Sequence, residues 1–171
     1  VAGSGSAGFS GDGGPATAAQ LHFPTHVALG ADGSLWISDT LNHRVRRVLP
    51  PGIIVTVAGD GEEGDAGDGG PATAAQLARP AGIAVDADGT AYVADQGNGR
   101  IRRIAPDGII HPHATLAGAA ALALAGPGEL LATSIGGGSV VRVAPTGAVA
   151  TEFSGLLERA EGLAIGPDGT V

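Results

Sequence analysis

The chain has 171 residues, a net charge of −8 and no cysteine, which excludes disulfide bonds, thiol catalysis and thiolate metal sites. It carries 31 glycines and 11 prolines with 43% hydrophobic residues, too apolar for a disordered chain and suited to many short elements joined by tight turns. The acidic balance disfavours sequence-independent binding to nucleic-acid phosphates.

An internal duplication organises the sequence. Residues 11–21 (GDGGPATAAQL) recur letter for letter as residues 67–77, and the segment from Val27 matches the segment from Ile83. A third copy follows from about residue 119, and a fourth begins with LAIGPDGTV near the end of the chain. The repeat unit is about 40 residues long, a length typical of propeller blades, and the first two copies carry an added insertion of about 16 residues.

Each copy predicts four short strands. The first copy places them at 27–29, 34–38, 44–48 and 53–57, and the second at 83–85, 91–94, 100–104 and just before Leu116. Turn sequences separate them, among them Ala31-Asp32-Gly33 and Pro106-Asp107-Gly108. Four-stranded units in tandem predict an all-β protein, a β-propeller built of four-stranded antiparallel blades. Since blades pack face to face, Val45 and Val48 are expected to pack on opposite neighbours.

The expected boundaries follow from the repeat. Residues 1–3 are assigned to the outer strand of a preceding blade, 21–59 and 77–118 to two full blades, 119–155 to a degenerate third blade, and 159–171 to the start of a further one. Three full blades and two partial ones do not close a ring, so we expect further blades from the same or another chain. In the third copy Ser134, Gly137 and Ser139 replace Asp95, Asn98 and Arg100, which indicates altered turn geometry there.

The units VALGADGSLWISDTLNHRVRRV and IAVDADGTAYVADQGNGRIRRI resemble NHL repeats. The segment GFSGDGGPATAAQL is similar to the inter-blade loops of bacterial and teneurin-like NHL propellers. The resemblance implies a non-catalytic binding or scaffolding module of a larger bacterial protein, extracytoplasmic or at the cell surface, such as a sensor domain. A protein or a carbohydrate is the expected ligand, and no membrane segment is expected within this chain.

The residues at the end of each second strand are assigned to turn structure. Asp39 and Asn42 bracket a tight connection, in which an Asp side chain accepts backbone amides of its own turn and Asn tolerates the left-handed conformation. The full set of expected turn residues is Asp39, Asn42, Arg44, Asp95, Asn98 and Arg100. The arginines are expected to pack over blade faces and pair with carboxylates; a basic stripe for RNA is the alternative.

The two long loops are the candidate partner-contact surface, because of their size and their repetition. Each contains PATAAQ, which predicts one short helical turn with proline at its first position and an aspartate near its N-terminus. The candidate contact residues are Phe9, Asp12, Gln20, Glu62, Glu63, Asp65, Asp68 and Gln76.

No catalytic residue, cofactor or metal is assigned. The acidic segment 60–68 lacks EF-hand spacing and its first-copy counterpart lacks most of the carboxylates, so a solvated loop is favoured over a calcium site. His26 lies near an inner strand, but its counterpart is Gly82, and the His111-Pro112-His113 segment lies in an outer strand. A propeller lyase or hydrolase whose metal ligands lie partly in other blades is the alternative function.

Overall fold

The chain folds into three four-stranded antiparallel sheets, which confirms the expected all-β architecture. The computed structural model describes residues 2–135, 137–154 and 162–163. The first blade contains β1 (Pro24–Leu29), β2 (Leu35–Asp39), β3 (Arg44–Leu49) and β4 (Ile53–Ala58). The second contains β5 (Pro80–Val85), β6 (Ala91–Asp95), β7 (Arg100–Ile104) and β8 (Ile110–Thr115). The third contains β9 (Ala119–Gly126), β10 (Glu129–Ser134), β11 (Ser139–Val143) and β12 (Val149–Phe153).

Helical structure in the described part of the chain is limited to 3₁₀ turns. Two of them lie in the long loops and two follow the second strand of a blade. They are η1 (Ala16–Ala18), η2 (Thr40–Asn42), η3 (Ala72–Ala74) and η4 (Gln96–Asn98). The short helical turn expected in each PATAAQ segment is therefore present as a single 3₁₀ turn.

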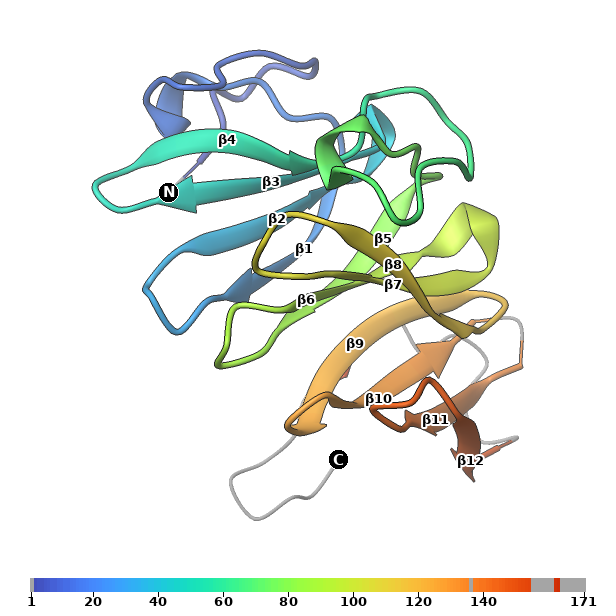
Figure 1. Cartoon of the computed structure of the whole chain (residues 1–171). Helices are drawn as coiled ribbons and strands as arrows, with labels where there is room; N and C mark the ends of the chain where they lie inside the picture. The colour runs from blue at the N-terminus through green and yellow to red at the C-terminus, as the bar shows by residue number, and fades with distance from the viewer. Residues whose placement is uncertain (1, 136, 155–161, 164–171) are drawn as a thin grey trace.

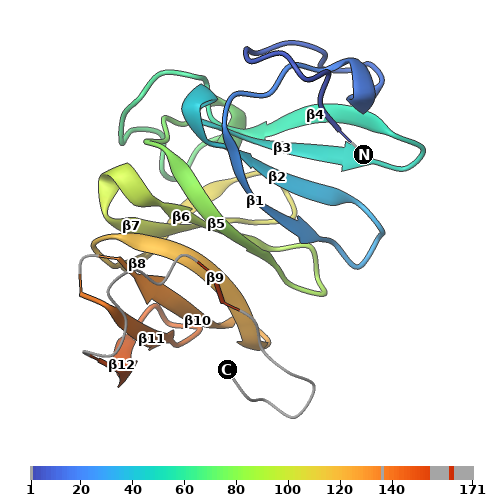
Figure 2. The same cartoon turned by 180° about the vertical axis from the view of Figure 1, so that it is seen from behind.

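The three blades lie one after another in chain order, with the second between the other two (Figures 1 and 2). The inner strands β1, β5 and β9 pack beside one another along one side of the stack. Trp36 and Val45 of the first blade share a core with Ile83 and Val93 of the second. A separate core joins the second and third blades.

Both faces of the first blade carry apolar side chains, and one of these faces packs against the second blade. Val45 and Val48 lie on the same strand, three positions apart, so their side chains point to opposite faces. Val45 packs in the core shared with the second blade, whereas Val48 packs with Ile54 against the first long loop. The two valines point to opposite faces as expected, but the expectation that each packs on a neighbouring blade is wrong for Val48, which the loop covers.

One face of the first blade is apolar and exposed. Val27 and Leu29 on β1 are 62% and 73% exposed. Ile83, which occupies the repeat position of Val27, is 3% exposed because the first blade covers it. A groove of about 380 Å³ runs over this face and is lined by Leu21 and Val27, among others. The face of the first blade that carries Val27 is thus exposed, whereas the equivalent face of the second blade is buried against the first.

The N-terminal segment differs from the strand that was expected there. Ala2 and Gly3 lie outside any strand, so the part of segment 1–3 that the structure describes is not an outer strand. Gly3 instead donates its N–H to the carbonyl of Ala16 at 2.9 Å, as Gly59 does to Ala72 at 3.0 Å after β4. The further blade expected at 159–171 falls almost entirely outside the described residues.

Candidate functional site: the clamped interblade loops

A fully buried arginine on β3 fastens the first long loop to the first blade. Arg46 is 0% exposed and donates from Nη2 to Asp12 of the loop at 2.7 Å and from Nη1 to Asp39 at the end of β2 at 3.3 Å. It also donates to the loop carbonyls of Ser10 at 3.2 Å and Gln20 at 3.5 Å. We call this arrangement, Arg46 with Asp12 and Asp39, the arginine clamp.

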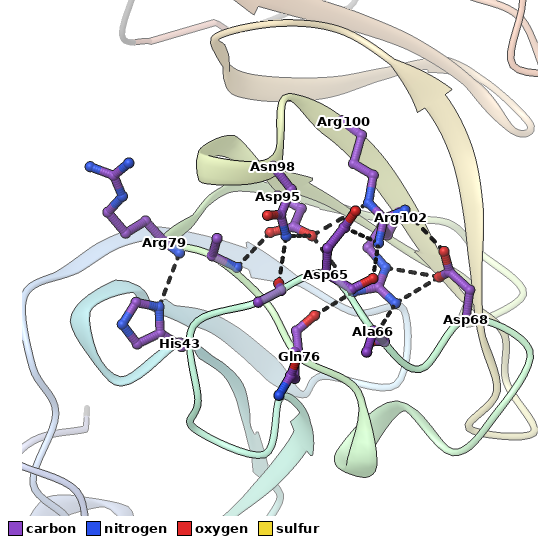
Figure 3. Close-up of polar contacts among 12 residues, drawn as sticks. His43, Asp65, Ala66, Asp68, Gln76, Arg79, Asp95, Asn98, Arg100 and Arg102 are labelled. Carbon is purple, nitrogen blue, oxygen red and sulfur yellow. Dashed lines mark hydrogen bonds and ion pairs between the residues drawn. The ribbon is translucent and has the colours of Figure 1, made fainter.

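The second blade repeats the clamp with Arg102, Asp68 and Asp95 (Figure 3). Arg102 is also fully buried; its Nε and Nη2 donate to Asp68 at 3.0 and 2.6 Å, and its Nη1 lies 3.6 Å from Asp95. Nη1 further donates to the carbonyl of Gln76 at 2.6 Å. A guanidinium suits this position because it offers five donors in a rigid fork and stays charged when buried.

The buried aspartates hold the chain that leads into each inner strand. Asp39 accepts the N–H of His22 at 2.7 Å, and Asp95 accepts the N–H of Ala78 at 2.8 Å. The prediction that these side chains accept amides of their own turn is therefore wrong. Each aspartate is the last residue of its strand, and its carboxylate points toward the loop that leads into the blade. Because the carboxylate is buried, each of its oxygens needs a hydrogen-bond donor.

The asparagines complete the same network. Nδ2 of Asn42 donates to Asp39 at 2.8 Å and to the carbonyl of Gly8 at 2.8 Å. Asn98 does the same with Asp95 at 2.8 Å and Gly64 at 2.7 Å. Each asparagine is the last residue of a 3₁₀ turn, so it is not the left-handed residue that was expected.

The left-handed position falls one residue later. His43 has φ 53° and its repeat counterpart Gly99 has φ 64°, both in the region that favours glycine. The histidine-to-glycine difference between the copies was the available sequence signal for this conformation. In the first blade the Nδ1 of His43 accepts the N–H of Arg79 at 3.2 Å, which links the turn to the second loop.

Each long loop also runs along the free edge of its blade. In the first blade Gly13 donates to the carbonyl of Ile54 at 2.8 Å, and Ile54 donates to Gly14 at 3.1 Å. In the second, the corresponding bonds join Gly69 and Gly70 to Ile110 at 2.8 and 3.1 Å. The loops thereby satisfy backbone groups of the outer strands and protect edges that would otherwise invite aggregation.

The alanines of PATAAQ are core residues. Ala16 and Ala19 are buried with Ile54, and Ala72 and Ala75 are buried in the core between the first two blades. Only a small side chain fits where the loop backbone lies this close to the sheet. The letter-for-letter repetition of residues 11–21 thus has a structural cause, which weakens repetition as an argument for partner contact.

The aspartate of each loop serves the clamp and not the helical turn. Asp12 accepts from Arg46 and, with its other oxygen, from the hydroxyl of Thr56 at 2.7 Å. Asp68 accepts from Arg102 and from Arg100 at 3.0 Å. Pro15 precedes its turn in an extended conformation, so the expectation of proline at the first helical position is wrong.

The outer arginines are paired as well. The guanidinium of Arg44 lies 3.8 Å from the centre of the Phe9 ring, and Arg44 donates to the carbonyl of Asn42 at 3.1 Å. Arg100, at the matching position, forms ion pairs with Asp65 and Asp68. These pairings confirm carboxylate contact for Arg100.

The candidate contact residues therefore divide into two groups. The carboxylates of Asp12 and Asp68 and the backbone carbonyls of Gln20 and Gln76 bind the clamp arginines. The tips remain open to solvent: Glu62, Glu63 and Asp65 are exposed, and Phe9 is 42% exposed. Glu63 and Arg79, both more than half exposed, lie 3.8 Å apart, a weak pairing at most.

The third blade lacks both the insertion and the clamp. Val141 occupies the position of Arg102 and Ser134 the position of Asp95, and both are buried. The hydroxyl of Ser134 donates to the carbonyl of Ala117 at 2.7 Å. The clamp residues thus accompany the long loop, which indicates that they serve to hold it. The sequence shows that these residues are replaced together in the third copy. That they hold the loop could be inferred only from the contacts in the structure.

The histidines and loop carboxylates do not gather. No group of three His, Cys, Asp or Glu side chains that could hold a metal occurs in the part of the chain that the structure describes. The His113 ring packs on Tyr92 with centroids 4.9 Å apart, and burial lowers the pKa of His113. In segment 60–68, Asp65 and Asp68 face arginines and the carboxylate of Asp60 accepts the N–H of Glu62.

The sheets and their packing define a β-propeller, and comparison with known proteins refines the type. Residues 52–135 match the Teneurin NHL domain. Teneurin-m of Drosophila melanogaster is 36% identical over 107 residues, covering 54% of this chain and 4% of that protein. Protein SUPPRESSOR OF QUENCHING 1, chloroplastic, of Arabidopsis thaliana is 36% identical over 85 residues, covering 49% and 8%. The chain is built of NHL-type β-propeller blades.

Solved structures share the fold. A streptogramin B lyase superposes with a TM-score of 0.64 at 21% identity, over 89% of this chain and 48% of the lyase. Virginiamycin B lyase from Staphylococcus aureus superposes with a TM-score of 0.55 at 20% identity, over 81% and 43%. At this identity the likeness concerns the fold alone. No helix among the described residues is long and apolar enough to cross a membrane.

Proposed function

We propose that this chain is a rigid, non-catalytic binding module whose ligand-facing surface is formed by the exposed tips of the two long loops. The arginine clamp carries the proposal. Buried arginines fix both loops to their blades, so the tips are held in one geometry without a ligand. Binding by a preorganised surface avoids the entropic cost of ordering a loop.

The two tips offer different chemistry on a shared frame. The second presents Glu62 and Glu63 in an acidic setting, whereas the first has Ser6 and Ala7 at the same repeat positions and the exposed ring of Phe9. An aromatic ring on one tip and an acidic patch on the other suit a protein ligand with a basic surface or a carbohydrate. The clamp is the same in both copies and the tip residues differ, which supports binding specificity located at the tips.

The duplication supplies matched variants for a test. E62S/E63A gives the second tip the residues of the first, and Phe9→Asp gives the first tip the Asp65 of the second. All three changes leave the ion pairs of the clamp in place, although Phe9→Asp removes a ring that lies 4.8 Å from the Arg46 guanidinium. The immobilised chain would be screened against purified extracellular protein domains and a glycan array. We expect a ligand whose affinity falls at least about tenfold in one tip variant, since interface energy concentrates in few residues. Ligands that bind both variants as tightly as the unaltered chain would contradict the proposal.

Two further proposals concern the setting of the module. The exposed face of β1 is suited to packing against another blade of the same type, from the same or another chain, because Ile83 at the repeat position of Val27 is buried in that way. A cell-surface or other extracytoplasmic location is favoured by the match to the Teneurin NHL domain. Fractionation of cells that express the natural gene tests the location.

A further inference from the structure

A second candidate site lies between the first two blades, at the end of β2 opposite to the clamp. A pocket of about 290 Å³ opens between the turn that precedes β2 and the turn that precedes β6. Asp32, Trp36 and Arg47 line it from the first blade, and Asp88 and Pro106 line it from the second. The loop tips do not contribute to it.

The first-blade wall is a fixed polar network beside an indole ring. The hydroxyl of Ser34 donates to Asp32 at 2.6 Å and accepts from Arg47 Nε at 3.0 Å and from the Trp36 indole N–H at 3.2 Å. The guanidinium of Arg47 lies 4.9 Å from the Trp36 ring centre and pairs with Asp32 at 2.5 Å. These contacts lower the pKa of Asp32 to about 2, the Ser34 hydrogen bonds being the largest cause.

The opposite wall adds a second carboxylate. Asp88 accepts the N–H of Thr90 at 2.8 Å and its hydroxyl at 3.0 Å, and these bonds lower the pKa of Asp88. Both aspartates are therefore acceptors at neutral pH. Together with Pro106 and the indole, the pocket combines two hydrogen-bond acceptors, one multiple donor and apolar surface.

At the interface between the second and third blades, polar side chains of the protein stand at the positions equivalent to this pocket. There Tyr92 takes the position of Trp36 and packs on His113, and the carboxylate of Asp86 accepts the N–H of Gly128 from the third blade at 2.7 Å. In the first blade Gly30 and Val57 replace Asp86 and His113, so neither group is available. At the second interface the protein's own side chains make these polar contacts, whereas the first interface lacks both groups and has the pocket.

We propose that the pocket between Trp36 and Asp88 binds a single sugar ring, either a free monosaccharide or the terminal residue of a glycan. A volume near 300 Å³ is at the small end of ligand sites, which suits one ring. Ring hydroxyls donate to the two carboxylates and accept from Arg47, while the C–H face of the ring packs on Pro106 and meets only the edge of the indole, since Trp36 is 4% exposed. This inference rests on the proposed binding function and adds a site remote from the loop tips.

Trp36 makes the site directly observable, because it is the one tryptophan in the chain. Its fluorescence would be followed during titration with hexoses, N-acetylhexosamines, deoxyhexoses and uronic acids, each as the free sugar and as the end of an oligosaccharide. We expect a saturable change with at least one class. Saturation by the free sugar identifies a monosaccharide site, and saturation by the oligosaccharide alone identifies a glycan terminus.

Variants separate the pocket from the loop tips. D32N and R47Q should each weaken the sugar at least about tenfold, because each leaves a desolvated hydroxyl without its partner. R142Q, at the matching position of the third blade, should have no effect. Sugar binding that survives D32N and R47Q but is lost in E62S/E63A would overturn the pocket and keep the proposed function. A flat fluorescence titration with every class would overturn the pocket, whatever the screen of the tips gives.

Discussion

Arg102 and Asp68 are 34 residues apart in sequence, yet two hydrogen bonds, of 3.0 and 2.6 Å, join the guanidinium to one carboxylate oxygen. The arginine is fully buried, and the aspartate belongs to the loop that the sequence shows as an insertion in the repeat. The contact makes the loop part of the blade. Its first-copy equivalent, Arg46 with Asp12, shows that the duplication preserved the relationship.

Replacing the buried arginine should expose how much the clamp contributes. Arg102→Val removes the buried one of the two arginines beside Asp95, leaving Arg100 at 3.7 Å, and it also frees Asp68; we expect a loss of about 3 kcal/mol in the free energy of unfolding. R102V/D95S reproduces the pair Val141 and Ser134 of the third blade and should recover part of that loss. Urea denaturation measures both. Arg142→Val, at a partly exposed arginine that pairs with Glu129 and Glu152, is the control and is expected to cost about 1 kcal/mol or less; equal losses in R102V and R142V would contradict a structural clamp.

The left-handed turn residue gives a second stability prediction. Gly99→Ala should destabilise the protein by about 1–2 kcal/mol, because an L-residue is strained at φ 64°. A Cβ there would lie 3.6 Å from the nearest atom, the Cα of Ala117, so crowding does not contribute. Gly99→Asn should cost less, since asparagine tolerates this conformation. Thermal denaturation of the two variants measures the difference, and equal losses of stability would show that backbone strain is not the cause.

Burial of Asp95 gives a pH dependence of known sign. Desolvation raises the pKa of Asp95 above its ordinary 3.8, although Asn98 and Ala78 donate to the carboxylate. The associated stability is present below pH 3.8 and is lost as pH rises through the raised pKa. The stability difference between the unaltered chain and Asp95→Asn should therefore shrink over that range. Carbon-13 NMR of the carboxyl group checks the pKa itself, and a value below 3.8 would contradict the account.

Asp32 should show the opposite behaviour. Its pKa of about 2 means that its contribution is present above 3.8 and is lost as pH falls toward 2. Asp32→Asn should remove this acid-side decline from urea denaturation curves recorded between pH 2 and 4. An unchanged decline in the variant would show that other carboxyl groups cause it.

The exposed face of the first blade predicts association. Leu29→Arg places a charge at a position that is 73% exposed, on the strand that carries the exposed Val27 and opposite Leu35 of β2. If this face packs against another blade, analytical ultracentrifugation should show concentration-dependent association of the unaltered chain that the variant loses. Leu41→Arg, at a leucine that is 41% exposed on η2, is the matched control and should associate normally. Identical behaviour of the three proteins would contradict packing through this face.

The repeat alone was sufficient to predict the strands, because short apolar runs between Asp-Gly and Pro-Gly turns leave few alternatives. It also marked Asp39, Asn42 and Arg44 as structural. The roles of Asp12 and Asp68 could not be predicted, because their partners Arg46 and Arg102 are distant in sequence and look like surface residues of a charged strand. The pocket beside Trp36 arises where Gly30 stands at the repeat position of Asp86, and only the packing of two blades shows that a pocket results.

Hydrogen exchange of the loop amides tests the central claim that the loops are rigid parts of their blades. Gly69 and Ala72 donate to Ile110 and Gly108 at 2.8 Å, and Gly13 and Ala16 make the matching bonds in the first loop. The account predicts that all four amides are protected in the unaltered chain, and that R102V removes protection from Gly69 and Ala72 while Gly13 and Ala16 keep theirs. Rapid exchange of all four amides in the unaltered chain would contradict it.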